Sequence, residues 1–210
     1  MDTVTDNLRH DILGGKFEPG DRLLEIQLAE EYDCGRAAVR SAIIELTSEG
    51  LVDRETNRGA TVRRITINEA IQITQARSAL ESLIASEAAR NATPDDHADL
   101  QEIIANMEAA VSEERATEYS ELNRTLHRRL REVSGHVIAG ELVANLRNRA
   151  AHHQYRLAVM PGRPNVSLGQ HAAIVEAVVA GDEQAASRAM REHLQSVIDV
   201  LQQWGDASIR

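Results

Sequence analysis

Four polar side chains in the second half of the sequence have the types and spacing of a metal site. Asn123 and His127 are four residues apart, so they lie on the same side of one helix. His171 and His193 each lie eleven residues from Asp182. If the helices on either side of Asp182 form an antiparallel hairpin, both imidazoles lie about 16 Å from the turn, at the same height. Such a set can bind Zn²⁺, Ni²⁺ or Mn²⁺.

Each of these histidines has an alternative role as a surface or core-edge residue with a local hydrogen bond. The convergence of several of them on one level favours the metal site. His152 and His153 are adjacent in the sequence and therefore face different directions. We expect neither of these two to be a ligand.

The basic residues are concentrated in one short part of a chain whose net charge is −10. Residues 1–34 carry three basic and nine acidic side chains, whereas residues 35–66 carry six arginines against four acids. A uniformly acidic protein would repel nucleic acid, because phosphate binding needs concentrated positive charge. Because residues 35–66 carry more basic than acidic side chains, the negative net charge of the chain does not argue against nucleic-acid binding by this part.

Two of these arginines have the spacing of a DNA-reading helix. Arg36 and Arg40 are four residues apart at the start of a predicted helix, so they project from one side of it. Arginine can contact guanine or a phosphate there, and the small pair Ala37-Ala38 lets the helix approach a base. The alternative is that these arginines belong to an ordinary solvent-exposed face of the helix and do not contact DNA.

The elements around these arginines predict a winged helix-turn-helix. Apolar residues recur at helical spacing in three segments, 4–13, 25–32 and 36–48. Two short strands, 51–55 and 60–65, flank a turn that contains Arg58 and Gly59. Such a hairpin is the wing, and we expect Arg58 and Gly59 at its tip to contact the DNA backbone or the minor groove.

The rest of the sequence is predicted to be helical to the end. The predicted helices are 68–90, 95–113, 117–133, 137–159, 168–180 and 183–203. We therefore expect a mainly α fold with two domains, a winged helix-turn-helix over 1–66 and an all-helical antiparallel bundle over 67–210. Because the sequence has one cysteine and shows no apolar run of about 18 residues and no signal-peptide pattern, we expect a cytoplasmic protein without a membrane segment.

The first 65 residues resemble the GntR family of bacterial regulators, in its FadR-like branch. The matching motifs are Gly14-x-Lys16-Phe17-x-Pro19-Gly20-x-x-Leu23, Leu28-Ala29-Glu30-x-Tyr32 and Arg36-Ala37-Ala38-Val39-Arg40-x-Ala42-Ile43-x-x-Leu46-x-x-Glu49-Gly50-Leu51-Val52. Members of the family usually have Ser-Arg-Thr-Pro-Val-Arg where this chain has residues 35–40. Both arginines are kept, so we expect the same mode of DNA contact, while the three changed positions leave the half-site sequence open.

Residues 70–203 resemble the FCD ligand-binding domain of the same branch. The matching motifs are Arg77-x-x-Leu80-Glu81, Asn123-x-x-Leu126-His127, His171-x-x-Ile174-x-x-Ala177-x-x-x-Gly181-Asp182-x-x-x-Ala186 and Met190-x-x-His193-Leu194. In metal-binding members an aspartate and three histidines line a central cavity. This chain matches the histidines but has Asn123 in place of the aspartate. Arg77 matches an arginine that often faces the cavity, and its alternative role is an ion pair with Glu81, one turn away.

The resemblance implies a transcriptional regulator that acts as a homodimer on a palindromic operator in double-stranded DNA. A metal next to Arg77 favours a carboxylate ligand, so we expect a small organic acid as effector. The alternatives are a histidine-site metalloenzyme and a ligand-free dimeric DNA-binding protein. The sequence shows no HExxH, Walker or nucleophile-elbow motif. We therefore do not expect an enzyme.

Overall fold

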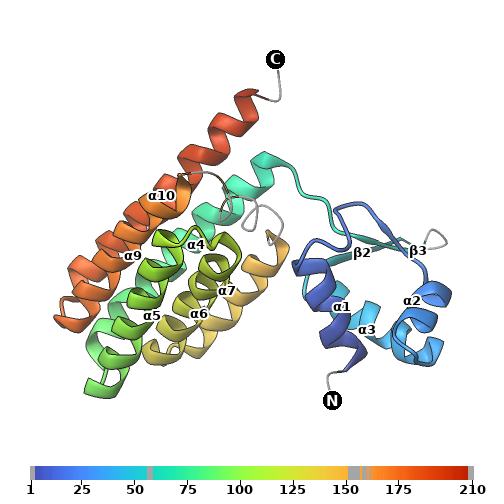
Figure 1. The fold of residues 1–210 in the computed structure, drawn as a ribbon, viewed down its shortest axis with the longest axis horizontal. Coiled ribbons are helices and arrows are strands. Elements are labelled where there is room, and N and C mark those ends of the chain that lie inside the picture. The colour runs from blue at the N-terminus through green and yellow to red at the C-terminus, as the bar shows by residue number, and fades with distance from the viewer. Residues whose placement is uncertain (1–2, 56–58, 151–156, 158–159, 161, 208–210) are drawn as a thin grey trace. The chain divides into compact units, whose positions relative to one another are not determined.

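The computed structural model describes residues 3–55, 59–150, 157, 160 and 162–207 of the chain (Figure 1). The chain divides into two compact units. One comprises Met1–Thr66 with Asn145–His153, and the other comprises Ile67–Ala144 with Gln154–Arg210. We call the first 66 residues the head and the helices that follow the helical domain, and we describe each by itself.

The head is a winged helix-turn-helix, as predicted. Its elements are the helices α1 (Val4–Leu13), α2 (Glu25–Glu31) and α3 (Arg36–Ser48), and the strands β1 (Arg22–Leu23), β2 (Val52–Glu55) and β3 (Gly59–Val62). The antiparallel sheet has the order β1-β3-β2, and β2 and β3 form the wing hairpin. Strand β1 was not predicted, because two residues are too few to show an alternating pattern.

Local sequence fixes where the helices of the head begin. Helix α1 starts at a capping box, in which the Thr3 side chain accepts a hydrogen bond from the Asp6 backbone and the Asp6 carboxylate accepts from Thr3. The turn before α3 includes Asp33, whose φ of 47° is left-handed and reverses the chain. Helix α3 then buries Val39 and Leu46 against α1 and α2. Its opposite side therefore faces outward.

The helical domain is an all-helical bundle, as predicted. Its helices are α4 (Ile67–Asn91), α5 (Pro94–Ser112), α6 (Ala116–Ser134), α7 (Val137–Arg149), α9 (Arg163–Val179) and α10 (Glu183–Ala207). Helix α4 packs against α6, α9 and α10, and α5 packs against α6 and α9 (Figure 1). The core between them consists mainly of Ala, Ile, Leu, Val and Met side chains. None of the described helices has the length and apolar character needed to cross a membrane.

Two predicted helices differ most from the observed ones. The predicted helix 137–159 is observed as α7, which ends at Arg149 and is followed by a turn at Ala150; residues 151–156 and 158–159, which include His152 and His153, lie outside the described part of the chain. The predicted helix 168–180 is observed as α9 and begins earlier, at Arg163. Pro164 lies in its first turn, where the missing N–H removes no helical hydrogen bond. Treating that proline as a helix stop was wrong.

Candidate functional site

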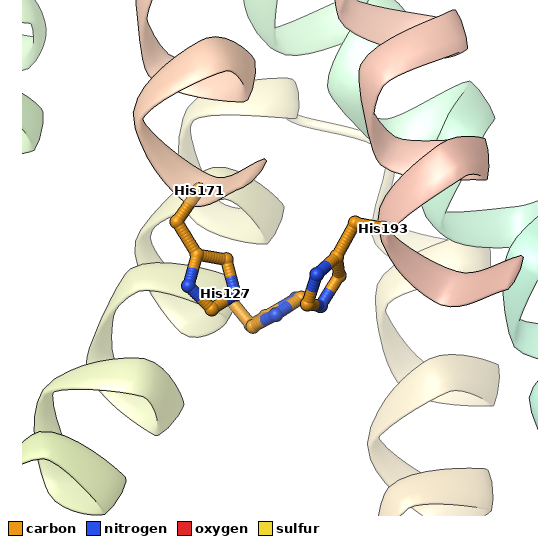
Figure 2. A group of neighbouring side chains, drawn as sticks. All are labelled: His127, His171 and His193. Atoms are coloured by element: carbon orange, nitrogen blue, oxygen red, sulfur yellow. The ribbon is translucent and has the colours of Figure 1, made fainter. Parts of the chain in front are cut away.

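Three histidines from three helices meet inside the helical domain. His127 lies on α6, His171 on α9 and His193 on α10, and Figure 2 shows their rings turned toward one another. Their candidate ligand atoms all lie within 4.8 Å of one another. The ring centroids of His171 and His193 are 4.4 Å apart, and that of His127 is 5.5 Å and 5.6 Å from them. The structure thus brings together three of the four predicted ligands.

Helical periodicity places these histidines in the interior. His127 lies on the buried side of α6 with Leu126 and Leu130, and His193 precedes the buried Leu194 on α10. His171 lies three residues before the buried Ile174 on α9. Each histidine therefore occupies a core position of its helix, and all three are at most 5% exposed. Imidazoles at such positions need polar partners, because unsatisfied buried polar groups are costly.

Each imidazole has a polar partner at its Nδ1 atom. His127 Nδ1 lies 2.7 Å from a carboxylate oxygen of Glu81, and His171 Nδ1 lies 3.3 Å from the Tyr119 hydroxyl. His193 Nδ1 lies 3.1 Å from the amide oxygen of Gln170. A hydrogen bond at one ring nitrogen fixes the ring and leaves the other nitrogen for a ligand. In all three rings the second nitrogen is Nε2.

The partner of His127 belongs to a buried ion pair. Arg77 Nε donates to the other carboxylate oxygen of Glu81 at 2.7 Å, and both side chains are less than 5% exposed. The carboxylate therefore bridges a guanidinium and an imidazole away from water. The ion pair expected as the alternative role of Arg77 is present, and it uses one of the five N–H donors of the guanidinium.

The partner of His193 belongs to a second polar chain. Gln170 Oε1 also accepts a hydrogen bond from Ser196 Oγ at 3.0 Å, and Arg163 Nη2 donates to Ser196 Oγ at 2.8 Å. Burial, helped by the neighbouring His171 and His127, holds the pKa of His193 well below its usual range. His193 is therefore neutral near pH 7, which is the form that binds metals.

The residue predicted as the fourth ligand has a buried oxygen. Asn123 lies one turn before His127 on α6. Its amide oxygen, Oδ1, is inaccessible to solvent and accepts no hydrogen bond from the described residues. A buried acceptor in this condition is costly unless a cation or donor satisfies it. Three imidazoles and one amide oxygen are a fitting donor set for a divalent ion of the zinc or nickel type.

In the head, the predicted DNA-contacting residues of α3 face outward. Arg36, Ala37, Ala38 and Arg40 are all exposed, whereas Val39 between them is fully buried. The two arginines therefore lie on the exposed side of the first turns of α3. At this end of a helix the dipole favours negative groups such as phosphate.

The predicted wing residues are described in part. Gly59 is exposed at the start of β3 and has a left-handed φ of 88°, which a glycine adopts without strain. Arg58 lies outside the described residues.

A carboxylate that the sequence reading missed lies against both arginines of α3. Glu25, the first residue of α2, accepts hydrogen bonds from Arg40 Nε at 3.1 Å and from Arg40 Nη2 at 2.8 Å. Its Oε2 atom also lies 3.5 Å from Arg36 Nη2. These contacts lower the pKa of Glu25, chiefly through the Arg40 hydrogen bonds. No periodicity links a residue of α2 with one fifteen positions later, so sequence spacing could not have revealed this contact.

Tyr119, Gln170, Ser196 and Arg163 were also missed. Gln170 is adjacent to His171, which is the only sequence signal that any of them carries. Their roles depend on contacts between helices, and these contacts are set by packing rather than by spacing within one helix.

A winged helix-turn-helix head followed by an all-helical domain with a buried polar centre defines a two-domain DNA-binding regulator. The profile of the bacterial regulatory proteins of the gntR family matches residues 1–62, and that of the FCD domain matches residues 72–196. The chain belongs to the GntR family of transcriptional regulators and carries an FCD domain. Regulators of this family bind DNA.

Known relatives match nearly the whole chain. The transcriptional repressor RspR of Escherichia coli K12 is 26% identical over 196 residues, which cover 93% of this chain and 86% of RspR. The transcriptional regulator LutR of Bacillus subtilis is 26% identical over 220 residues, which cover 95% of this chain and all of LutR.

Solved structures show the same fold. E. coli McbR/YncC aligns over 97% of this chain and 99% of its own, with a TM-score of 0.84 and 23% identity. A GntR transcriptional regulator from Rhodococcus sp. RHA1 aligns over 95% of this chain and 96% of its own, with a TM-score of 0.76 and 24% identity.

The buried Glu81 carboxylate should be essential for stability. Glu81→Ala leaves the Arg77 guanidinium buried without its counter-charge, so we expect the free energy of unfolding to fall by about 3–5 kcal/mol. Urea-induced unfolding followed by circular dichroism measures this change. Glu183→Ala, which breaks the solvent-exposed ion pair with Arg90, is the matched control and should lower the stability far less. Equal losses in the two variants would contradict the assigned role of Glu81.

Proposed function

We propose that the chain binds an operator in double-stranded DNA through its head, and that a small organic acid, held with a divalent metal in the helical domain, controls operator affinity. The observation that carries this proposal is the cluster of three buried histidines. Each has its Nδ1 atom held by a different polar side chain. A buried set of this kind is costly to build, and strongly perturbed buried groups are typical of functional sites.

The proposed metal ligands are Asn123, His127, His171 and His193, with Zn²⁺, Ni²⁺ or Mn²⁺ as candidate ions. When bound, the ion would supply a concentrated positive charge that a carboxylate can coordinate. Asn123 brings no negative charge, whereas an aspartate at this position would. The uncompensated charge of the site therefore favours an anionic ligand.

We propose Arg77 as a second contact of the acid. Its ion pair with Glu81 uses the Nε atom, and the two Nη groups of the planar guanidinium are the forked donors that suit a carboxylate. The ion pair then has a positioning role, because it holds the guanidinium in one orientation before the acid binds.

No observation favours a metalloenzyme instead. Hydrolysis at such a site needs a general base beside the metal. Glu81 is the single buried carboxylate among the described residues, and it is already bonded to Arg77 and His127. RspR and LutR are named as transcriptional regulators, which also favours regulation.

For the head, we propose that Arg36 and Arg40 enter the major groove and contact guanine or phosphate. Ala37 and Ala38 are exposed between them and are small enough to let the helix approach a thymine methyl group. Gly59, with the neighbouring Arg58, would contact the backbone or the minor groove. A homodimer would place two heads on a palindromic operator. Effector binding in the helical domain would then shift the population of head arrangements that fit the operator.

Metal binding should depend on the histidine cluster. Wild-type protein loaded with zinc and dialysed should retain about one metal ion per chain, measured by plasma mass spectrometry. His171→Ala should lose most of it. His97→Ala removes a histidine of α5 outside the cluster and should retain the wild-type content. Full zinc retention in His171→Ala would exclude the proposed site.

Operator binding should depend on the two arginines of α3. Arg36→Ala/Arg40→Ala should weaken binding to DNA from upstream of its own gene by about thirtyfold or more, because each forked contact is worth about 1–3 kcal/mol. Gel-shift titration measures this loss. The double variant Arg90→Ala/Arg191→Ala removes the same charge from exposed positions of the helical domain and should bind normally. Unchanged binding by the α3 variant would refute the assignment of the recognition helix.

Glu25 should compete with DNA for the same arginines. Glu25→Gln removes the negative charge that contacts Arg40, so affinity for DNA of random sequence should rise roughly two- to fivefold, the value of an exposed ion pair. Fluorescence anisotropy at several salt concentrations measures it. Glu30→Gln, an exposed acid of the same helix, is the control for net charge. A rise of the same size in Glu30→Gln would show that Glu25 acts only through net charge.

A further inference from the structure

The buried charges of the helical domain do not balance. Among the described residues, the buried ionised side chains are two arginines, Arg77 and Arg163, and one carboxylate, Glu81. Glu81 is bonded to Arg77, so that pair is neutral as a unit. Arg163 therefore carries a buried positive charge that no buried carboxylate of the described residues offsets.

Arg163 is the first residue of α9 and is 9% exposed. Its Nη2 atom donates to a neutral hydroxyl, Ser196 Oγ, at 2.8 Å. It forms no ion pair with an acid among the described residues. Asp199, the carboxylate whose charge influences the pKa of Arg163, is exposed and forms no ion pair with it. Burial lowers the pKa of the Arg163 guanidinium, which shows that the surroundings disfavour its charge.

Arg163 is connected to the histidine cluster. Ser196, which accepts its hydrogen bond, donates to Gln170, and Gln170 contacts His193. The charge of Arg163 is also one of the causes that lower the pKa of His193. The unbalanced guanidinium and the three imidazoles therefore belong to one polar region inside the bundle.

An uncompensated buried cation is costly unless an anion completes it. A bound divalent metal would add two more positive charges to this region, and Asn123 would offset none of them. A ligand with one carboxylate would leave most of the excess in place. A ligand with two carboxylates offsets more of it.

We propose that the effector is a dicarboxylate, with one carboxylate at the three-histidine site and the other paired with Arg163. This inference rests on the proposed function and adds the chemical class of the effector and a residue that selects it. Arg163 is the specificity-determining contact, because its guanidinium forms a forked, charged hydrogen bond only with an acid that has a distal carboxylate.

Matched pairs of acids test this inference. The probes are malate, 2-hydroxyglutarate and 2-hydroxyadipate, each compared with the 2-hydroxy monocarboxylate that has a methyl group in place of the distal carboxylate. Calorimetric titration of zinc-loaded full-length protein should show at least one dicarboxylate binding about tenfold or more tightly than its partner, the expected value of a charge-assisted hydrogen bond. Wild-type protein that prefers no dicarboxylate overturns the inference.

Variants of Arg163 identify the contact. Arg163→Gln should abolish the preference, so that each dicarboxylate binds no more tightly than its monocarboxylate partner, and Arg163→Lys should keep part of it. Arg129→Gln is the control, because Arg129 is paired with Asp96 and Asp99 in the same domain. A preference that survives in Arg163→Gln overturns the inference.

Thermal unfolding separates ligand binding from a structural role. Without any acid, Arg163→Gln should not lower the unfolding midpoint, because the substitution removes an unbalanced buried charge. A dicarboxylate should raise the midpoint of the wild-type protein more than that of Arg163→Gln. A lower midpoint without ligand would assign Arg163 a structural role instead. If no acid of either kind binds the wild-type protein, the proposed function fails; if only monocarboxylates bind, this inference alone fails.

Discussion

The burial of imidazole and guanidinium groups inside a core of small aliphatic side chains is the constraint on which the helical domain depends. Water is excluded from His127, His171 and His193, so each needs a protein partner in a fixed position. Those partners come from α4, α6 and α9, and they therefore tie the helices together by directional bonds as well as by apolar contact. The packing of the bundle therefore determines the geometry of the site, because the same contacts between helices produce both.

Sequence spacing predicted the parts of this arrangement that lie within rigid elements. We expected His171 and His193 to lie side by side because residues that are equally far from the turn of an antiparallel helical hairpin lie at the same level along the two helices. The Arg77–Glu81 pair follows from one helical turn. Contacts between helices could not be read in this way. Glu81 and His127 are 46 positions apart, and their meeting depends on how α4 packs against α6.

The head shows the same division between what local pattern fixes and what packing decides. The bounds of α1 and α3 follow from apolar periodicity, and α1 also begins at a capping box, so they were predictable. The outward direction of Arg36 and Arg40 follows from the burial of Val39 between them. Strand β1 exists only because β3 pairs with it, so the wider structure decides an element that has no local signal. The start of α9 differs, because a proline in the first turn is a local signal for the start of a helix, and it was wrongly taken as a stop.

The contact between Glu25 and the arginines of α3 has a consequence for how such a regulator finds its operator. A protein that searches a genome must leave many wrong sequences quickly, and each departure strips phosphate partners from its arginines. If Arg36 and Arg40 contact DNA as proposed, their guanidinium groups would return on departure to Glu25, a carboxylate of their own domain. We expect this internal partner to shorten the time that the head spends on each wrong sequence. The search for the operator would then be faster, and the affinity of the head for DNA would be lower.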